Sequence, residues 1–415
     1  MKKIILSIIS ALLCVAMICS MAACDNSSNK ETEQSDTESE SETKATKATN
    51  KKTETEAEKG LSFYTELPLE QLEAGVTTTS AALAKRTYKL SESGSKLRMI
   101  GRSKVINKGV ICDHSASGIE FQGFMTGDLN LVATSEGDNY YTVYIDGKRM
   151  PERLHLTKAN VKVTTFEGNY FHTVKILKQS ESAWSQSTLA KIELTGELFD
   201  PPKERELLIE VLGDSLTTGY GNLGKKGEGN AQGGNTPLKE DATQSYGFLA
   251  AEKLNADCSI VAWSGVGLDV SYTGTSYGDY YKKYSFHRDR NGDDYDYGRA
   301  PDLLVIHLGA NDSTNKQTTK EGFTNKAKEL ITTIREGYKK EMPIIWAYDP
   351  DEGVPEYIQE VLDSFGGEAK GLYILELEWH SKDDFWGASG HPSVKAHEAH
   401  ANILVDLITT KNIIK

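Results

Sequence analysis

Between residues 75 and 195, the chain contains short runs in which apolar and polar positions alternate. Such alternation is typical of strands that have one buried face. Turn signals, among them Asp146-Gly147 and Glu167-Gly168-Asn169, separate the runs. No long amphipathic helix interrupts them, so the pattern predicts an antiparallel β-sandwich. The clearest runs are 118–124, 140–145 and 171–177.

From residue 206 onward, mostly apolar runs alternate with amphipathic segments. In the last segment, Val394, His397, Ala401, Leu404 and Ile408 form one helical stripe. Apolar strands separated by helices are typical of a parallel sheet that helices cover on both faces. The predicted strands are 207–212, 259–263, 303–308, 343–348 and 372–375, and the predicted helices include 246–254, 323–338, 354–364 and 393–409.

The first 60 residues follow neither pattern. Lys2 and Lys3 precede an apolar stretch that ends in Met21-Ala22-Ala23-Cys24. This order resembles a bacterial lipoprotein signal, in which Cys24 becomes the lipidated first residue; the alternative is a secretory signal cleaved near Ala23. A permanent transmembrane helix is less favoured, because the apolar stretch is short. Residues 25–59 are rich in Ser, Thr, Glu and Lys, so we expect a disordered tether.

Length and composition limit the number of domains and the kinds of partner that the protein can have. A chain of 415 residues favours two folded domains, and Pro201-Pro202 marks a stiff boundary between them. The net charge of −13 argues against a nucleic-acid partner, since phosphate binding needs a basic patch. Cys112 and Cys258 fall in different predicted domains, and no metal-ligand spacing is visible. We therefore expect no disulfide framework, no metal and no cofactor.

The first strand of the second domain ends in Gly213-Asp214-Ser215-Leu216. A serine at such a turn is well placed to be a nucleophile, because the strand fixes the backbone of the serine and the glycine permits a tight turn. The next helix can also offer its first N–H groups to an oxyanion. Alone, the same residues are an ordinary helix cap, and Asp214 is expected to accept hydrogen bonds from backbone N–H groups of the turn.

Three further blocks follow later strands or open the last helix: Ser264-Gly265-Val266-Gly267, Gly309-Ala310-Asn311-Asp312 and Gly390-His391-Pro392-Ser393. Sites in parallel sheets lie beyond the carboxyl ends of the strands, so we expect the blocks to converge. Ser215 would be the nucleophile and His391 its base. The backbone N–H groups of Ser215 and Gly265, and the side-chain amide of Asn311, would bind the oxyanion.

Together these blocks resemble the SGNH, or GDSL, hydrolase superfamily, and most closely the two-domain acetyl esterases of carbohydrate esterase family 2. The resemblance covers roughly residues 75–410. Its supporting segments are 117–121, 143–147, 172–176, 213–222, 254–257, 262–265 and 391–397. It implies an α/β, flavodoxin-like hydrolase domain over 205–415 and an all-β jelly-roll sandwich over 75–200. A signal peptide over 1–23 and a linker over 24–60 would precede them.

The chain departs from the family pattern at the residues before the histidine. Where many members have an aspartate three residues earlier, this chain has Ala388. We therefore expect a Ser215–His391 dyad in which a backbone carbonyl orients the imidazole, as the resemblance implies. Asp383 or Asp384 is the alternative.

A second departure concerns the sugar. The family often has Asp-Trp directly before the histidine, where this chain has Ser389-Gly390. Trp386 or another tryptophan would then have to supply the aromatic contact. The remaining candidates are interpreted as structural: Asp312, His307, His397 and His400 are expected to serve the turn or the core.

The resemblance implies a serine esterase that removes O-acetyl groups from plant cell-wall polysaccharides, such as acetylated xylan or mannan, through an acetyl-enzyme. The signal implies secretion and a lipid anchor at Cys24 on the outer face of the bacterial membrane or the cell surface. One alternative is a lipase, thioesterase or peptidoglycan deacetylase on the same scaffold. Another is a glycan-binding lipoprotein with a vestigial esterase site.

Overall fold

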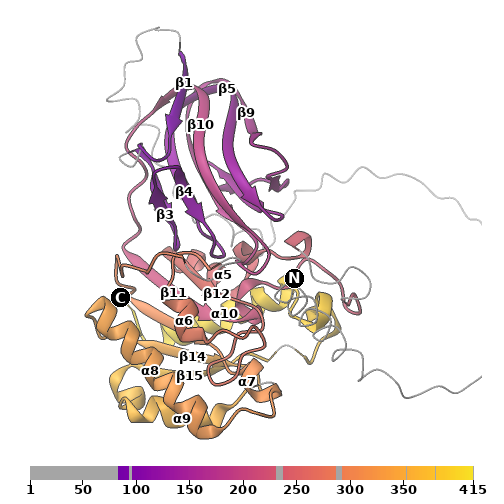
Figure 1. Ribbon diagram of the computed structural model, residues 1–415, viewed down its shortest axis with the longest axis vertical. Helices are drawn as coiled ribbons and strands as arrows, with labels where there is room; N and C mark the ends of the chain where they lie inside the picture. The colour runs from indigo at the N-terminus through magenta and orange to yellow at the C-terminus, as the bar shows by residue number, and fades with distance from the viewer. Residues whose placement is uncertain are drawn as a thin grey trace, which may run out of the picture. The chain divides into compact units, whose positions relative to one another are not determined.

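The computed structural model describes residues 83–92, 96–229, 237–286, 292–351, 353–378 and 380–414 (Figure 1). All of them belong to one compact unit. The signal peptide predicted over 1–23 and the linker predicted over 24–60 lie outside the described residues. In the part of the chain that is described, no helix combines the length and the apolar character that a membrane span requires.

The N-terminal domain is built from antiparallel strands, which confirms the predicted all-β domain. The strands pair in the order β3-β4-β10-β5-β9-β6-β7, with β1 beside β10, β2 beside β5 and β8 beside β6. Their bounds are β1 Lys85–Lys89, β2 Arg98–Ile100, β3 Lys104–Ile106, β4 Gly109–Cys112, β5 Gly118–Glu136, β6 Tyr140–Ile145, β7 Lys148–Arg149, β8 Leu154–His155, β9 Asn160–Lys178 and β10 Gln186–Leu198.

Two long strands, β5 and β9, form the centre of this sheet. Each has 19 residues, and their inward side chains, such as Phe121 and Val174, are completely buried. The sequence pattern identifies only part of each strand, 118–124 and 171–177. The pairing shifts register near Met125 and again near Leu129, and each shift interrupts the simple alternation of buried and exposed positions.

The C-terminal domain is a parallel sheet of five strands flanked by helices, as predicted. The strand order is β12-β11-β13-β14-β15. The strands are β11 Leu207–Gly213, β12 Ala256–Ala262, β13 Leu303–His307, β14 Ile344–Tyr348 and β15 Leu372–Glu376. The helices are α4 Ser215–Thr218, α5 Tyr246–Lys253, α6 Tyr277–Tyr281, α7 Ala310–Thr314, α8 Lys320–Tyr338, α9 Pro355–Ser364 and α10 Val394–Thr410. Short 3₁₀ turns are η4 Pro237–Lys239, η5 Ala242–Gln244, η6 Gly367–Lys370, η7 Asp383–Phe385 and η8 Ala388–Gly390.

This strand order is flavodoxin-like, and its switch point lies between β11 and β13. Helices α6, α8 and α9 pack on one face of the sheet, and α5 and α10 pack on the other (Figure 1). The core on the α5 and α10 face also includes Tyr144 and Leu177 of the N-terminal domain. The fold therefore brings the segments that follow β11 and β13 together at one edge of the sheet.

A buried ion pair links the two domains. Nη2 of Arg102 lies 3.0 Å from Oε1 of Glu210, and both side chains are at most 1% exposed. The guanidinium also lies over the rings of Tyr281 and Tyr295, at 4.4 and 3.8 Å from their centroids. The hydroxyls of Tyr281 and Tyr338 donate to Glu210. Removing one partner would leave the other charge buried without its counter-charge.

Replacing Arg102 with leucine should therefore destabilise the protein strongly. We expect Arg102→Leu to lower the free energy of unfolding by about 3 kcal/mol or more. The matched control is Arg86→Leu, because the Arg86–Glu197 pair is about half exposed. That change should lower it by less than about 1 kcal/mol. Urea unfolding followed by tryptophan fluorescence measures both, and equal losses would contradict the importance of the buried pair.

Candidate active site

Ser215 stands where β11 ends and the short helix α4 begins. Asp214 caps this helix: its Oδ1 accepts a hydrogen bond from the backbone N–H of Leu216 at 3.0 Å, and its side chain is completely buried. This confirms the expected role of Asp214 as an acceptor in the turn. The helix ends at Gly219, which has a φ of 78°, and the chain turns there toward the segment that bears His391.

The loop after α4 holds the loop of His391 through backbone hydrogen bonds. The N–H of Ala388 donates to the carbonyl of Gly221 at 2.9 Å, and the N–H of Val394 donates to that of Asn222 at 3.2 Å. A Cβ atom at Gly221 would lie 2.5 Å from the carbonyl oxygen of Ala388, and φ is 70° there, so only glycine fits. The serine turn and the histidine loop are thereby packed against each other.

Tyr220, in the same loop, contacts His391 directly, with ring centroids 4.5 Å apart. Among the described residues, no hydrogen bond joins Ser215 Oγ to His391 Nε2. Such bonds are often long in a free enzyme and shorten when substrate binds.

A backbone carbonyl orients the imidazole of His391. Its Nδ1 lies 2.9 Å from the carbonyl oxygen of Ser389. Ser389 has a φ of 56°, which places this residue in the left-handed region and makes the contact possible across a very short loop. Because Nδ1–H donates to the carbonyl, Nε2 carries the lone pair that a general base needs.

Neither alternative aspartate takes this place, because each pairs with a lysine. Asp383 lies 2.6 Å from Lys226, and Asp384 pairs with Lys395. His391 is partly exposed, yet burial of its ring lowers its pKa to about 4, while the bond to the Ser389 carbonyl opposes that shift. The imidazole is therefore neutral near pH 7.

Two of the three predicted oxyanion donors, Gly265 and Asn311, have different surroundings. Gly265 follows β12 with a φ of 78°; its carbonyl accepts from the N–H of Tyr272 at 2.9 Å, whereas its own N–H bonds to no described residue. Nδ2 of Asn311, in α7, lies 3.0 Å from both Asp214 Oδ2 and the carbonyl of Val266. An amide nitrogen has two hydrogens, so Asn311 must release one of these partners to donate to an oxyanion.

Asp312 is structural, as expected. Its carboxylate is buried and accepts backbone hydrogen bonds from Leu268 at 2.9 Å and Asp269 at 2.8 Å. These bonds hold the loop that follows Gly265. The sequence block Gly309-Ala310-Asn311-Asp312 therefore connects the third strand of the domain to the loops after the first and second.

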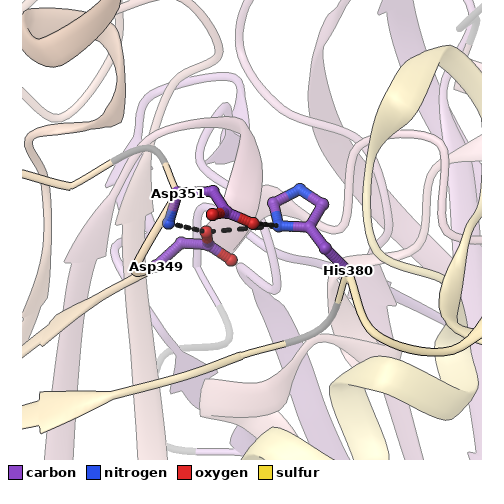
Figure 2. Close-up of side chains that lie close together, drawn as sticks. All are labelled: Asp349, Asp351 and His380. Atoms are coloured by element: carbon purple, nitrogen blue, oxygen red, sulfur yellow. Dashed lines mark hydrogen bonds and ion pairs between the residues drawn. The ribbon is translucent and has the colours of Figure 1, made fainter.

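A cluster that the sequence analysis did not identify lies beyond the carboxyl ends of β14 and β15 (Figure 2). Nδ1 of His380 lies 2.9 Å from Asp351 Oδ2 and 3.4 Å from Asp349 Oδ1. Ligand-type atoms of the three residues lie within 4.8 Å of one another, so these are the described residues best placed to hold a metal ion. The sequence hides this set, because helix α9 separates the aspartates from the histidine.

Three other histidines surround the ring of Tyr246 inside the domain. The ring centroids of His307, His397 and His400 lie 5.4, 6.3 and 6.4 Å from it. They are core residues, as expected, but neither ring nitrogen of His307 bonds to a described residue. Burial lowers the pKa of His307 to about 3, that of His400 to about 4, and that of His397 well below its ordinary value.

Two family models match consecutive parts of the chain. The carbohydrate esterase 2 N-terminal model matches residues 99–202, and the GDSL-like lipase/acylhydrolase model matches residues 209–404. The cellulase/esterase CelE of Acetivibrio thermocellus is 28% identical over 314 residues, which are 73% of this chain but only 38% of that protein. An acetylxylan esterase / glucomannan deacetylase of Cellvibrio japonicus is 26% identical over 331 residues, covering 77% of this chain and 87% of that protein.

Solved structures agree with these matches. A family two carbohydrate esterase from Clostridium thermocellum, in complex with cellohexaose, has a TM-score of 0.69 and 26% identity over 76% of this chain and 99% of that chain. A family two carbohydrate esterase from Cellvibrio japonicus has the same fold, with a TM-score of 0.68 and 21% identity. The match covers 80% of this chain and 99% of that chain. The parallel sheet and the serine turn thus define a GDSL (SGNH) hydrolase domain. With the N-terminal domain that matches the carbohydrate esterase 2 model before it, the chain is similar in both domains to the esterases of carbohydrate esterase family 2.

The buried histidines should make the protein sensitive to acid. Their pKa values are lowered in the folded state, so below about pH 6.5 the unfolded chain binds more protons. The free energy of unfolding should keep its full histidine contribution above that pH. It should fall toward pH 4 by up to about 1.4 kcal/mol per pH unit for each histidine. His307→Phe should flatten this dependence, because it removes one of the histidines whose pKa burial lowers. Urea unfolding at several pH values measures the slope, and an unchanged slope in His307→Phe would contradict the assignment.

Proposed function

We propose that this protein removes O-acetyl groups from plant cell-wall polysaccharides, such as acetylxylan or glucomannan, by means of a Ser215–His391 dyad. The geometry of His391 carries the proposal: a carbonyl fixes Nδ1, and the histidine loop is hydrogen-bonded to the loop that follows the helix of Ser215. Similarity to an acetylxylan esterase / glucomannan deacetylase supports acetyl as the acyl group. The related esterase in complex with cellohexaose supports a polysaccharide ligand.

In the first half of the reaction, Ser215 Oγ attacks the carbonyl carbon of the acetyl ester, and His391 Nε2 takes its proton. The N–H groups of Ser215 and Gly265 would donate to the oxyanion that forms. The Asn311 amide would join them after releasing Asp214 or Val266. When the intermediate collapses, the bond to the sugar oxygen breaks, and His391 returns the proton to that oxygen. The sugar leaves with a free hydroxyl.

In the second half, water attacks the acetyl-enzyme. His391 is neutral again, so it takes a proton from the water as the new C–O bond forms. Collapse of this intermediate breaks the bond to Ser215 Oγ, which regains its proton from His391, and acetate leaves. The lowered pKa of His391 favours the neutral form needed at the start of both halves.

The first residues of the sequence bear on where the enzyme is located. The order of Lys2, Lys3, an apolar stretch and Met21-Ala22-Ala23-Cys24 supports secretion. We propose in addition that Cys24 carries a lipid anchor, and that the polar residues after it connect the anchor to the enzyme at the cell surface.

Loss of either member of the dyad should abolish turnover. Ser215→Ala and His391→Ala should each lower kcat for 4-nitrophenyl acetate by about 10³-fold or more. The wild type should prefer the acetate over the butyrate and octanoate esters, and should release acetate from acetylated xylan or glucomannan. A spectrophotometric assay of the esters and an acetate assay of the polymers measure both.

Acetate release that survives Ser215→Ala would contradict the proposed mechanism. A preference for octanoate would favour a lipase or another acyl esterase. Unimpaired glycan binding without turnover of any ester would instead favour a glycan-binding protein with a vestigial site.

Tyr272 is an exposed aromatic residue beside the proposed oxyanion loop. Its side chain is 57% exposed, and its backbone N–H donates to Gly265. Trp386, by contrast, lies against His380 and beneath the ammonium of Lys226. We therefore propose that Tyr272 contacts the sugar ring, because an exposed aromatic face near the reacting atoms can cover the apolar face of a pyranose.

Tyr272→Ala should raise KM for acetylated xylo-oligosaccharides by about three- to tenfold. Its effect on 4-nitrophenyl acetate, which has no sugar, should be smaller. Tyr170→Ala is the matched control, because Tyr170 is 65% exposed but lies within β9, in the N-terminal domain. Steady-state kinetics on both substrates test this, and equal effects of the two changes would contradict a sugar contact at Tyr272.

A further inference from the structure

Glu181 of the N-terminal domain contacts the loop that would supply an oxyanion donor. It lies between β9 and β10, and its side chain is completely buried. Oε2 accepts a hydrogen bond from the backbone N–H of Ser264 at 2.6 Å, and Oε1 accepts one from the hydroxyl of the same serine at 2.5 Å. Ser264 directly precedes Gly265. One carboxylate thus holds both the backbone and the side chain of the residue next to the proposed donor.

The segment that carries Glu181 is itself held firmly. The backbone N–H of Glu181 donates to Glu240 Oε1 at 2.7 Å, and Nε1 of Trp184 donates to Glu240 Oε2 at 2.9 Å. The buried ammonium of Lys178 donates to the carbonyls of Ser180 and Glu181, at 2.6 and 3.2 Å. Because its anchors are buried and hydrogen-bonded, Glu181 can fix the position of Ser264 rather than follow it.

Gly265 needs such support from its neighbours. A glycine has no side chain to pack, and its φ of 78° is only one of several conformations open to it. Glu181 fixes the preceding residue, and the bond from the N–H of Tyr272 fixes the carbonyl of Gly265. The peptide between Ser264 and Gly265 is thereby held from both sides, with its N–H bonded to no described residue.

We infer that Glu181 is a positioning residue for catalysis: through Ser264 it aims the N–H of Gly265 at the oxyanion. This inference rests on the proposed esterase function. It makes the N-terminal domain part of the catalytic machinery, although no residue of that domain needs to touch the acetyl group. A role in folding alone would lower stability and leave kcat per folded molecule unchanged.

The test compares variants of the full chain with 4-nitrophenyl acetate as substrate, and measures kcat, KM and thermal stability for each. Glu181→Ala should lower kcat by about 10²-fold, because small misplacements of a donor have effects of that size. KM should change by less than about threefold, since the donor acts mainly in the transition state. Glu181→Gln keeps an acceptor for the Ser264 N–H and should recover kcat to within about tenfold of wild type.

Glu120→Gln is the matched control. It also alters a buried carboxylate of the N-terminal domain, but Glu120 pairs with Arg98 and holds neither Glu181 nor Ser264, so kcat should stay within about threefold of wild type. A double-mutant cycle adds a second control. If Glu181 acts through Ser264, then Glu181→Ala should lower kcat less in a Ser264→Ala background than in the wild type.

Several results would overturn the inference. A wild-type kcat in folded Glu181→Ala would do so, and so would parallel losses of kcat and stability in Glu181→Ala and Glu120→Gln. If Glu181→Ala does not fold, the cycle is made with Glu181→Gln instead, and an equal effect of that change on kcat in the wild-type and Ser264→Ala backgrounds would overturn the inference. Hydrolysis that Ser215→Ala abolishes but the Glu181 variants retain would overturn this inference alone. No hydrolysis by the wild type would overturn the proposed function and this inference with it.

Discussion

Buried carboxylates that accept hydrogen bonds from backbone N–H groups fix the loops at the carboxyl edge of the sheet. Asp214, Asp312 and Glu181 each do this for a different loop. The donors are Leu216, Leu268, Asp269 and Ser264. A charge inside a protein is costly unless donors surround it, so a loop that moved away would leave a carboxylate unpaired. Burial of these carboxylates therefore costs stability if a loop moves, and for that reason it keeps the loops rigid.

The sequence predicts what depends on local pattern. The parallel strands and the helices appear within three residues of their predicted bounds, because burial on a sheet face or a helix stripe recurs with a fixed period. The long antiparallel strands are predicted only in part, since register shifts near Met125 and Leu129 break the alternation. Ser215 and Asp214 are recognisable because a turn at a strand end has its own local signature.

The sequence does not predict contacts between distant segments. Nothing in the residues around Glu181 distinguishes a buried glutamate from a solvated one, because its partner Ser264 belongs to the other domain. The cluster of Asp349, Asp351 and His380 is equally hidden. For Asn311 the residue type indicates a donor, but only the folded structure shows that both amide hydrogens already have partners.

The tight packing around Ala388 explains why a carbonyl takes the place of an acid beside His391. Ala388 is completely buried, and a Cβ atom on Gly224 would lie 2.4 Å from the Cβ atom of Ala388. A carboxylate at this position would have no room without displacing the loop that holds the histidine. The carbonyl of Ser389 fixes the tautomer as an acid would, but it carries no full charge to stabilise an imidazolium. Burial of the ring therefore lowers the pKa of His391, and only the bond to this carbonyl opposes the shift.

The contact between the domains is polar as well as apolar. The polar contacts suggest a reason why the two domains occur in one chain. Arg102 pairs with Glu210, Arg149 with Asp241, and Glu181 binds Ser264, all with at least one partner buried. A domain that served only as a spacer would need none of these bonds, because buried charges add little net stability over apolar packing. They do restrict the interface to one arrangement. In the proposed mechanism, where the Gly265 N–H donates to the oxyanion, such a restriction acts on the reaction itself, since the donor can be no more ordered than the residues that hold it.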